Sequence, residues 1–187
     1  MKNLAVAVAL GSLAASQAAF AVGPEDPVAD PGSQTELPTP PEDPKCADGM
    51  VWDTESEQCL DAKSEMLDDV ERLEAVREYA YAEQLAVASA VLDTMRDQNS
   101  DGALTYRGFL ARKLGSFDTG MEWYAKALKQ NPDNLMARSY MGQGLVEAEE
   151  MDLALEQLVE IQQRGGRDSW PERALRLALE HGKGDSY

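Results

Sequence analysis

Two consecutive stretches of 34 residues decide the fold of this chain. Residues 101–134 read DGALTYRGFLARKLGSFDTGMEWYAKALKQNPDN, and residues 135–168 read LMARSYMGQGLVEAEEMDLALEQLVEIQQRGGRD. Laid one on the other, the two stretches carry identical residues at five positions, which are Ala103/Ala137, Tyr106/Tyr140, Gly108/Gly142, Asp118/Asp152 and Glu122/Glu156. A repeat of this length predicts a helix–turn–helix unit stacked on a copy of itself.

The ends of the expected helices can be placed within the first copy. Residues 114–117 (Leu-Gly-Ser-Phe) have the composition of a turn between two helices, and residues 131–134 (Asn-Pro-Asp-Asn) close the unit because proline cannot continue a helix. The period, the Gly108 spacing and the Gly120-x-x-x-Tyr124-x-x-Ala127 pattern together resemble the tetratricopeptide repeat family. The resemblance implies an all-α, right-handed solenoid of helical hairpins, with a concave groove that binds partner segments.

Weaker copies flank the two clear ones. Residues 61–98 contain neither glycine nor proline and have apolar residues spaced by three and four, which predicts two helices with a turn near residues 79–82 or one long helix. Ser169, Pro171 and Glu172 are typical of a helix start, and Gly182 of a helix end. We therefore expect a helical domain over 64–181, with about three repeats (65–98, 101–134 and 135–168), a capping helix (169–181) and a tail (182–187).

The N-terminus has the pattern of a secretory signal peptide. Lys2 precedes an apolar run, and small residues end at Ala19-Phe20-Ala21, which predicts cleavage after residue 21. The alternative is a membrane anchor, which the short, alanine-rich run does not favour. The expected location is therefore periplasmic or secreted, in a bacterium, with no membrane insertion after cleavage.

Two segments separate this leader from the helices. Residues 22–45 are acidic and hold seven prolines, which predicts a disordered, extended linker or, alternatively, a proline-rich ligand for a groove. Cys46 and Cys59 are the only cysteines. Exported chains pair their cysteines, so we expect a small disulfide loop over 46–60 rather than a metal or redox pair.

The composition of the chain argues against two classes of function, nucleic-acid binding and catalysis. The chain has 34 acidic and 17 basic residues and a formal net charge of −17, which argues against binding to nucleic acid. A single histidine, His181, and the absence of nucleotide-binding, hydrolase or metalloprotease motifs argue against an enzyme. We expect no cofactor and no catalytic residue.

Basic residues gather in the two clear repeats. Residues 22–100 carry 20 acids and 5 bases, whereas residues 101–140 carry 4 acids and 6 bases. By the family resemblance, the groove of this chain is lined by Thr105, Phe109, Arg112, Lys113, Ser139, Gln143, Val146 and Glu147. An apolar ring between cations suits a protein or peptide segment that is acidic or has a free C-terminus. Alternatively, the bases pair with neighbouring acids, or the acidic N-terminal arm occupies the groove.

One motif suggests a different function. Asp97, Asn99, Asp101 and Thr105 fall at the first, third, fifth and ninth positions of an EF-hand calcium loop, with Gly102 at the turn. Position twelve is Gly108, where the loop needs a bidentate glutamate, so we expect no metal.

The sequence thus predicts a non-catalytic, exported adaptor for protein–protein interaction. The alternatives are a calcium-modulated binding protein and a self-assembling envelope component, and a homo-oligomer is compatible with any of the three.

Overall fold

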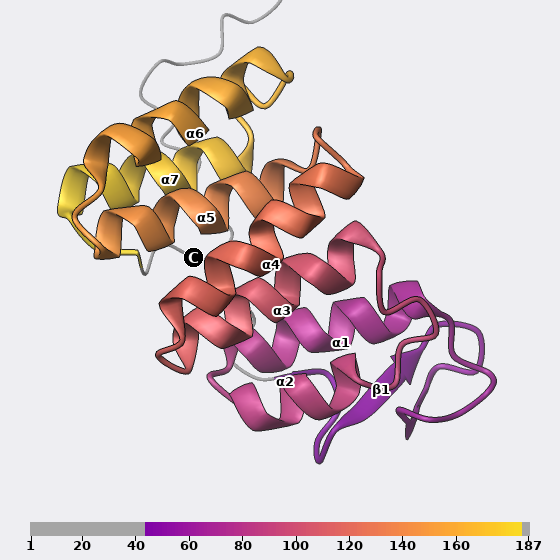
Figure 1. Ribbon diagram of the computed structural model, residues 1–187. Coiled ribbons are helices and arrows are strands. Elements are labelled where there is room, and N and C mark those ends of the chain that lie inside the picture. The colour runs from indigo at the N-terminus through magenta and orange to yellow at the C-terminus, as the bar shows by residue number, and fades with distance from the viewer. Residues whose placement is uncertain (1–43, 185–187) are drawn as a thin grey trace, which may run out of the picture. The chain divides into compact units, whose positions relative to one another are not determined.

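A β-hairpin followed by seven helices makes up the part of the chain that the computed structural model describes, residues 44–184 (Figure 1). The predicted signal peptide, the Pro-rich linker up to residue 43 and residues 185–187 lie outside the described residues. The strands are β1 (Met50–Asp53) and β2 (Gln58–Asp61). The helices are α1 (Asp69–Tyr81), α2 (Leu85–Leu92), α3 (Asp101–Lys113), α4 (Phe117–Gln130), α5 (Leu135–Glu147), α6 (Met151–Gln163) and α7 (Trp170–His181). The all-α class is confirmed for the described residues apart from this short hairpin.

The helices pack as consecutive pairs. α1 packs on α2, α3 on α4 and α5 on α6, while α7 packs on both α5 and α6. The first helices of the pairs also contact one another in chain order, α1 with α3, α3 with α5, and α5 with α7. The bounds of α3 and α5 differ by 34 residues at both ends, and so do the starts of α4 and α6. Residues 69–92 form two helices, not one, with residues 82–84 between them.

Side-chain caps explain where several helices begin and end. Ser100 and Asn134 lie at equivalent positions of the two repeats, and their side chains accept hydrogen bonds from the backbone N–H groups of Ala103 and Ala137. Ser169 caps α7 in the same way. Gly182 ends α7 with a φ of 67°, a left-handed conformation that glycine adopts without steric cost.

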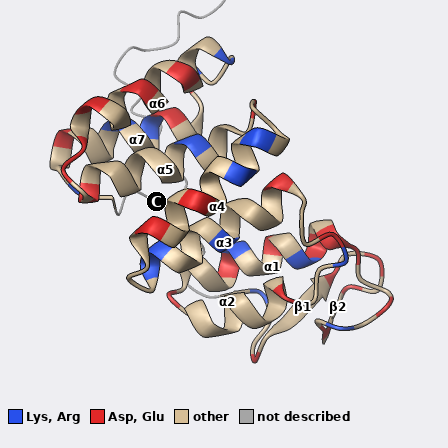
Figure 2. Ribbon diagram, in the orientation of Figure 1, with Lys and Arg blue, Asp and Glu red and all other residues tan. Residues whose placement is uncertain are grey.

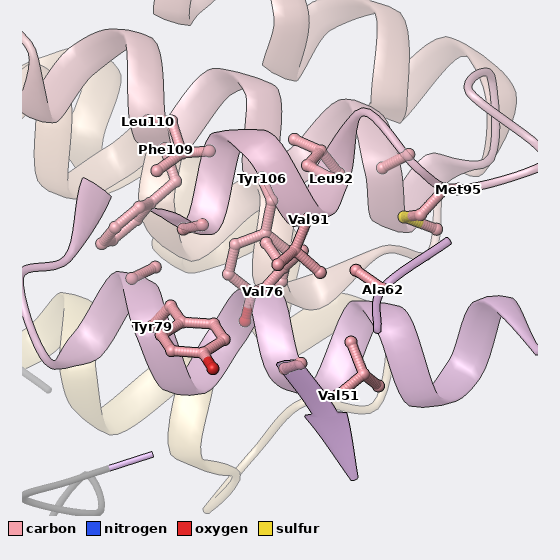
Figure 3. Packing of buried hydrophobic residues seen from close by; sticks show 14 of the residues in the cluster. Val51, Ala62, Val76, Tyr79, Val91, Leu92, Met95, Tyr106, Phe109 and Leu110 are labelled. Carbon is pink, nitrogen blue, oxygen red and sulfur yellow. The ribbon is translucent and has the colours of Figure 1, made fainter. Parts of the chain in front are cut away.

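One large apolar cluster joins the hairpin to the first helices. Val51 of β1, Val76 of α1, Val91 of α2 and Phe109 of α3 are each at most 1% exposed and belong to this cluster (Figure 3). A second cluster, around Leu145, Ile161 and Leu175, joins α5, α6 and α7. Burial of this apolar surface is the main force that holds the pairs together.

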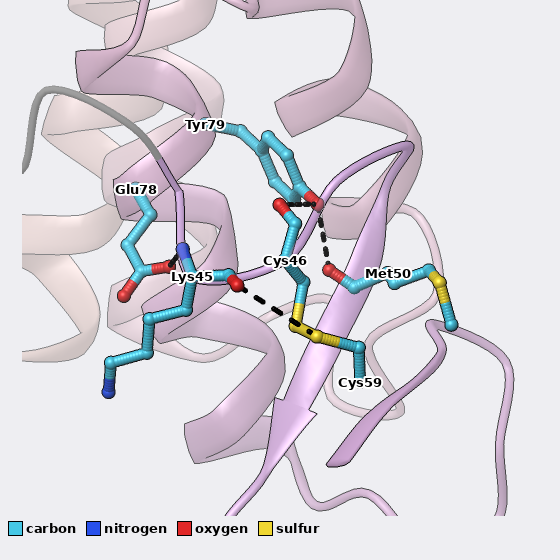
Figure 4. Close-up of a disulfide and its surroundings, with 6 residues drawn as sticks. All are labelled: Lys45, Cys46, Met50, Cys59, Glu78 and Tyr79. Atoms are coloured by element: carbon cyan, nitrogen blue, oxygen red, sulfur yellow. Dashed lines mark hydrogen bonds between the residues drawn. A yellow bond between two sulfur atoms is a disulfide. The ribbon is translucent and has the colours of Figure 1, made fainter.

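The predicted disulfide is present and closes the hairpin. Cys46 and Cys59 are bonded, with a Cα–Cα distance of 5.8 Å. The Tyr79 hydroxyl of α1 lies 2.8 Å from the carbonyl oxygen of Cys46 and 2.9 Å from that of Met50, so it ties the hairpin to the helices (Figure 4). The sequence predicts a loop here, but β1 and β2 pair as antiparallel strands, with Trp52 opposite Cys59.

Candidate functional site

Five aromatic side chains from α1, α3, α5 and α7 lie together. Tyr81 of α1, Tyr106 and Phe109 of α3, Tyr140 of α5 and Trp170 of α7 form what we call the aromatic cluster. The ring centroids of Phe109 and Tyr140 are 5.0 Å apart, and those of Tyr140 and Trp170 are 6.3 Å apart. The cluster therefore runs across four helices that are distant in sequence.

The tyrosines of the cluster are joined through their hydroxyl groups. The hydroxyls of Tyr81 and Tyr140 are hydrogen-bonded to each other. Burial raises the pKa of Tyr81, and it raises the pKa values of Tyr106 and Tyr140 well above the usual range. These phenols are therefore neutral at physiological pH, and since Tyr106, Phe109 and Tyr140 are at most 6% exposed, the centre of the cluster serves packing and hydrogen bonding within the protein.

Cations border the cluster on α3. The Lys113 Nζ lies 5.9 Å from the centre of the Phe109 ring, and the Arg112 guanidinium carbon lies 5.7 Å from it. On α1, Arg77 forms an ion pair with Glu74, and the side chains of both are more than 40% exposed. Tyr81, Lys113 and Trp170 are half-buried, so part of the cluster and its cationic border lie at the surface.

Most residues of the predicted groove are not at the surface. Thr105, Phe109, Arg112, Ser139, Gln143 and Val146 are all at most 6% exposed. This placement corrects the expectation that they line an open groove. Of the eight predicted residues, Lys113 is half-buried, and the Glu147 side chain is 35% exposed.

The contacts of these residues show why they are buried. The Ser139 hydroxyl donates to the carbonyl oxygen of Pro171 at 2.8 Å, and the Gln143 side chain donates to the Ser139 hydroxyl at 3.2 Å. Thr105 accepts from the Asn134 side chain at 3.1 Å. The predicted residues thus lie in the interface between the first helices of successive pairs. Helical periodicity shows which residues share a face of a helix, but it does not show whether that face is covered by another helix or open to solvent.

The basic residues of the repeats are paired with acids. Arg112 lies 2.6 Å from Glu147, and Arg138 lies 3.3 Å from Glu160. Arg107 lies 3.2 Å from Asp93. The alternative that these bases pair with neighbouring acids therefore accounts for Arg107 and Arg112 on α3 and for Arg138 on α5. Figure 2 shows the acidic residues spread over the hairpin, α1 and α6.

Sequence reasoning missed four members of the aromatic cluster, Tyr81, Tyr106, Tyr140 and Trp170. A signal for two of them was present, because Tyr106 and Tyr140 are identical residues at equivalent positions of the two repeats. The family resemblance directed attention to the positions beside them instead.

The EF-hand-like segment does not form a loop around an ion. Thr105 lies inside α3 and donates to the carbonyl oxygen of Asp101 at 2.6 Å. The Asp101 carboxylate accepts from Asn131 at 2.7 Å and from Asn134 at 2.9 Å, and that of Asp97 accepts from the Asn99 backbone. Within residues 44–184, no group of three or more His, Cys, Asp or Glu side chains could hold a metal ion.

Two further findings concern relatives of the chain and its described helices. Comparisons with protein-family models, with curated proteins and with solved structures gave no match. Among the described helices, none combines the length and the apolar character needed to cross a membrane.

Proposed function

We propose that this chain is a non-catalytic adaptor of the tetratricopeptide type, exported from a bacterial cell, that binds a segment of another protein. The observation that carries the proposal is the aromatic cluster and its cationic border. Aromatic and arginine side chains at a surface are the residues that most often anchor protein–protein contacts. In this chain Phe109 and Tyr140 form the buried base of the cluster, and Tyr81, Trp170 and Arg77 reach the surface on helices of successive pairs, as an extended binding surface requires.

The repeat interpretation is supported by the helix bounds. The second pair of helices begins 34 residues after the first, and the caps Ser100 and Asn134 are also 34 residues apart. A solenoid of right-handed hairpins with α7 as its cap is the arrangement that we propose from these bounds and from the pairwise packing.

The chemistry of the surface suggests the kind of partner. Lys113 and Arg77 would pair with a carboxylate of the partner, while Tyr81 and Trp170 would pack against an apolar side chain. An extended segment with an acidic residue beside an apolar one meets both requirements.

Photo-crosslinking in the native host tests this proposal. A photoreactive residue at Lys113 lies on the cationic border, whereas one at Lys183, which is exposed beyond α7, serves as the control. We expect one partner protein to be captured from position 113 and not from position 183. Capture of the same proteins from both positions, or of none from position 113, would contradict the proposal.

A further inference from the structure

A second place on the molecule is hollowed beside α3. A cavity of about 190 Å³ lies between α2, α3 and α4, and we call it the Trp123 cleft. Its apolar lining comprises Leu92, Leu110, Ala111, Leu114 and Trp123, and Arg107 lies at its edge. Leu92 and Leu110 are at most 4% exposed, whereas Leu114 is 63% exposed. The cleft thus has a buried aliphatic floor and an exposed apolar rim.

Two cations flank the tryptophan of this cleft. The Lys126 Nζ lies 3.9 Å from the centre of the Trp123 ring, and the Arg107 guanidinium carbon lies 5.8 Å from it. Arg107 also pairs with Asp93 and donates a hydrogen bond to the side-chain oxygen of Gln98. The Arg107 side chain is 27% exposed and that of Asp93 is 63% exposed, so the ion pair is solvated on the Asp93 side and a carboxylate from outside can take the place of Asp93 at small cost.

The second repeat serves as an internal comparison. Thirty-four residues after Leu114, Trp123 and Lys126, the chain has alanine, glutamine and glutamate, at Ala148, Gln157 and Glu160, and Arg107 corresponds to Met141. The second pair of helices forms without an aromatic ring or a cation at these positions. The second pair thus forms without these residues, whereas in the first pair Trp123 also packs against the buried Leu104, Ala127 and Ala137.

We infer that the Trp123 cleft binds an acidic segment of a partner protein, in which a bulky apolar side chain stands beside an Asp or Glu. The apolar side chain enters the cavity between Leu110 and Trp123, and the carboxylate pairs with Arg107 and Lys126. Charge supports an acidic partner at this place, because residues 101–140, which hold Arg107, Trp123 and Lys126, carry 6 bases and 4 acids within a chain of net charge −17. This surface is distinct from the aromatic cluster, so the inference does not depend on the proposed function.

The three tryptophans allow a direct test in the full-length chain. Trp52 lies in the hairpin, Trp123 in the cleft and Trp170 in the aromatic cluster, so their indole N–H signals in an NMR spectrum report on three separate places. The probes are two synthetic hexapeptides with blocked ends. One has Leu-Phe at its centre and two Glu on either side, and in the other the four Glu are replaced by Lys.

We expect the acidic probe to shift the Trp123 signal in a saturable way, while the Trp52 and Trp170 signals stay in place and the basic probe has no effect. Arg107→Met combined with Lys126→Glu introduces the residues of the second repeat and should raise the dissociation constant at least about tenfold. Lys129→Glu removes a neighbouring exposed cation outside the cleft and should change the dissociation constant by less than about twofold. Unchanged Trp52 and Trp170 signals show that the variants are folded.

Several results would overturn the inference. These are an unmoved Trp123 signal, an equal shift with the basic probe, or an equal loss of affinity in Lys129→Glu. A shift of Trp170 alone would place the probe on the aromatic cluster, which would support the proposed function and contradict the cleft. If the Trp123 signal shifts when the protein is diluted without any probe, the cleft is occupied by a second copy of the chain. If the signal shifts when residues 22–43 are deleted, the cleft is occupied by the N-terminal arm.

Discussion

The ion pair between Arg112 and Glu147 links the α3–α4 pair to α5, and its two members should not be equally important. The Arg112 side chain is 2% exposed, whereas that of Glu147 is 35% exposed, and the two are 2.6 Å apart. Burial alone would lower the pKa of Arg112, but the Tyr124 phenol and the Glu147 carboxylate outweigh it and raise the pKa above its usual value. Removal of Glu147 therefore leaves a positive charge that is buried, whereas removal of Arg112 leaves a negative charge that water can reach.

Glu147→Ala leaves the buried guanidinium without its carboxylate. Loss of one partner of a fully buried pair costs about 3–5 kcal/mol, and since Glu147 is partly reached by water we expect about 2–3 kcal/mol here. Arg112→Met leaves a carboxylate that water can solvate and fills the space with an apolar chain, so we expect about 1 kcal/mol or less. The double variant should resemble Arg112→Met.

These free energies can be measured by urea unfolding monitored by circular dichroism. A change in the urea midpoint at an unchanged dependence on urea concentration gives the change in the free energy of unfolding. Glu74→Ala is the control, because its ion pair with Arg77 is exposed on both sides and should change stability by about 0.5 kcal/mol or less. If Arg112→Met costs as much as Glu147→Ala, the argument that an unpaired guanidinium is costlier here than an unpaired carboxylate is refuted.

Further variants test other contacts of the fold. Tyr79→Phe removes the donor to two carbonyl groups of the hairpin and should cost about 1–2 kcal/mol in urea unfolding, and an unchanged midpoint would show that the hairpin is not tied to α1 through this hydroxyl. Gly108→Ala places a methyl group 2.6 Å from the buried Tyr124 ring and should destabilise by about 1–2 kcal/mol despite the better helix propensity of alanine, so a stabilised variant would contradict this packing. Burial opposes the charge of Glu172, but hydrogen bonds from Gln162, the Asp168 backbone and Arg176 lower its pKa. The pKa of a glutamate in the unfolded chain is about 4.3, so the contribution of Glu172 to stability should be present above that pH and be lost as the pH falls through the lower pKa of the folded state. Glu172→Gln should flatten this part of a curve of stability against pH. Reduction of the disulfide should cost about 3 kcal/mol, and alkylation without reductant should find no free thiol.

Local sequence signals predicted much of the fold. The glycine, proline and asparagine residues between the helices and the serine and asparagine caps act within a few residues, so residue patterns were sufficient to place α3 to α7 closely. The disulfide also followed from the cysteine count. The strands β1 and β2 were missed because each has only four residues, too few for an alternating pattern to be recognised.

The candidate site was less predictable because it depends on contacts between helices far apart in sequence. Arg112 was expected in a groove, but its partner Glu147 lies 35 residues away and on another helix pair. Trp170 joins the aromatic cluster through packing of α7 on α5, which no local pattern indicates. The place of Arg107 beside the cleft depends on α2 and α4, which no local pattern in α3 indicates.

The most direct test of the proposed function is the yield of partner adduct as a photoreactive residue is moved over the surface of the full-length chain. Arg77, Tyr81 and Lys113 lie in or beside the aromatic cluster, whereas Glu57 in the hairpin and Lys129 on α4 are exposed residues that do not belong to it. We predict a single partner captured from the first three positions and not from the last two. Equal yields from both sets of positions, or capture from Glu57 and Lys129 alone, would contradict the claim that the aromatic cluster is the binding surface.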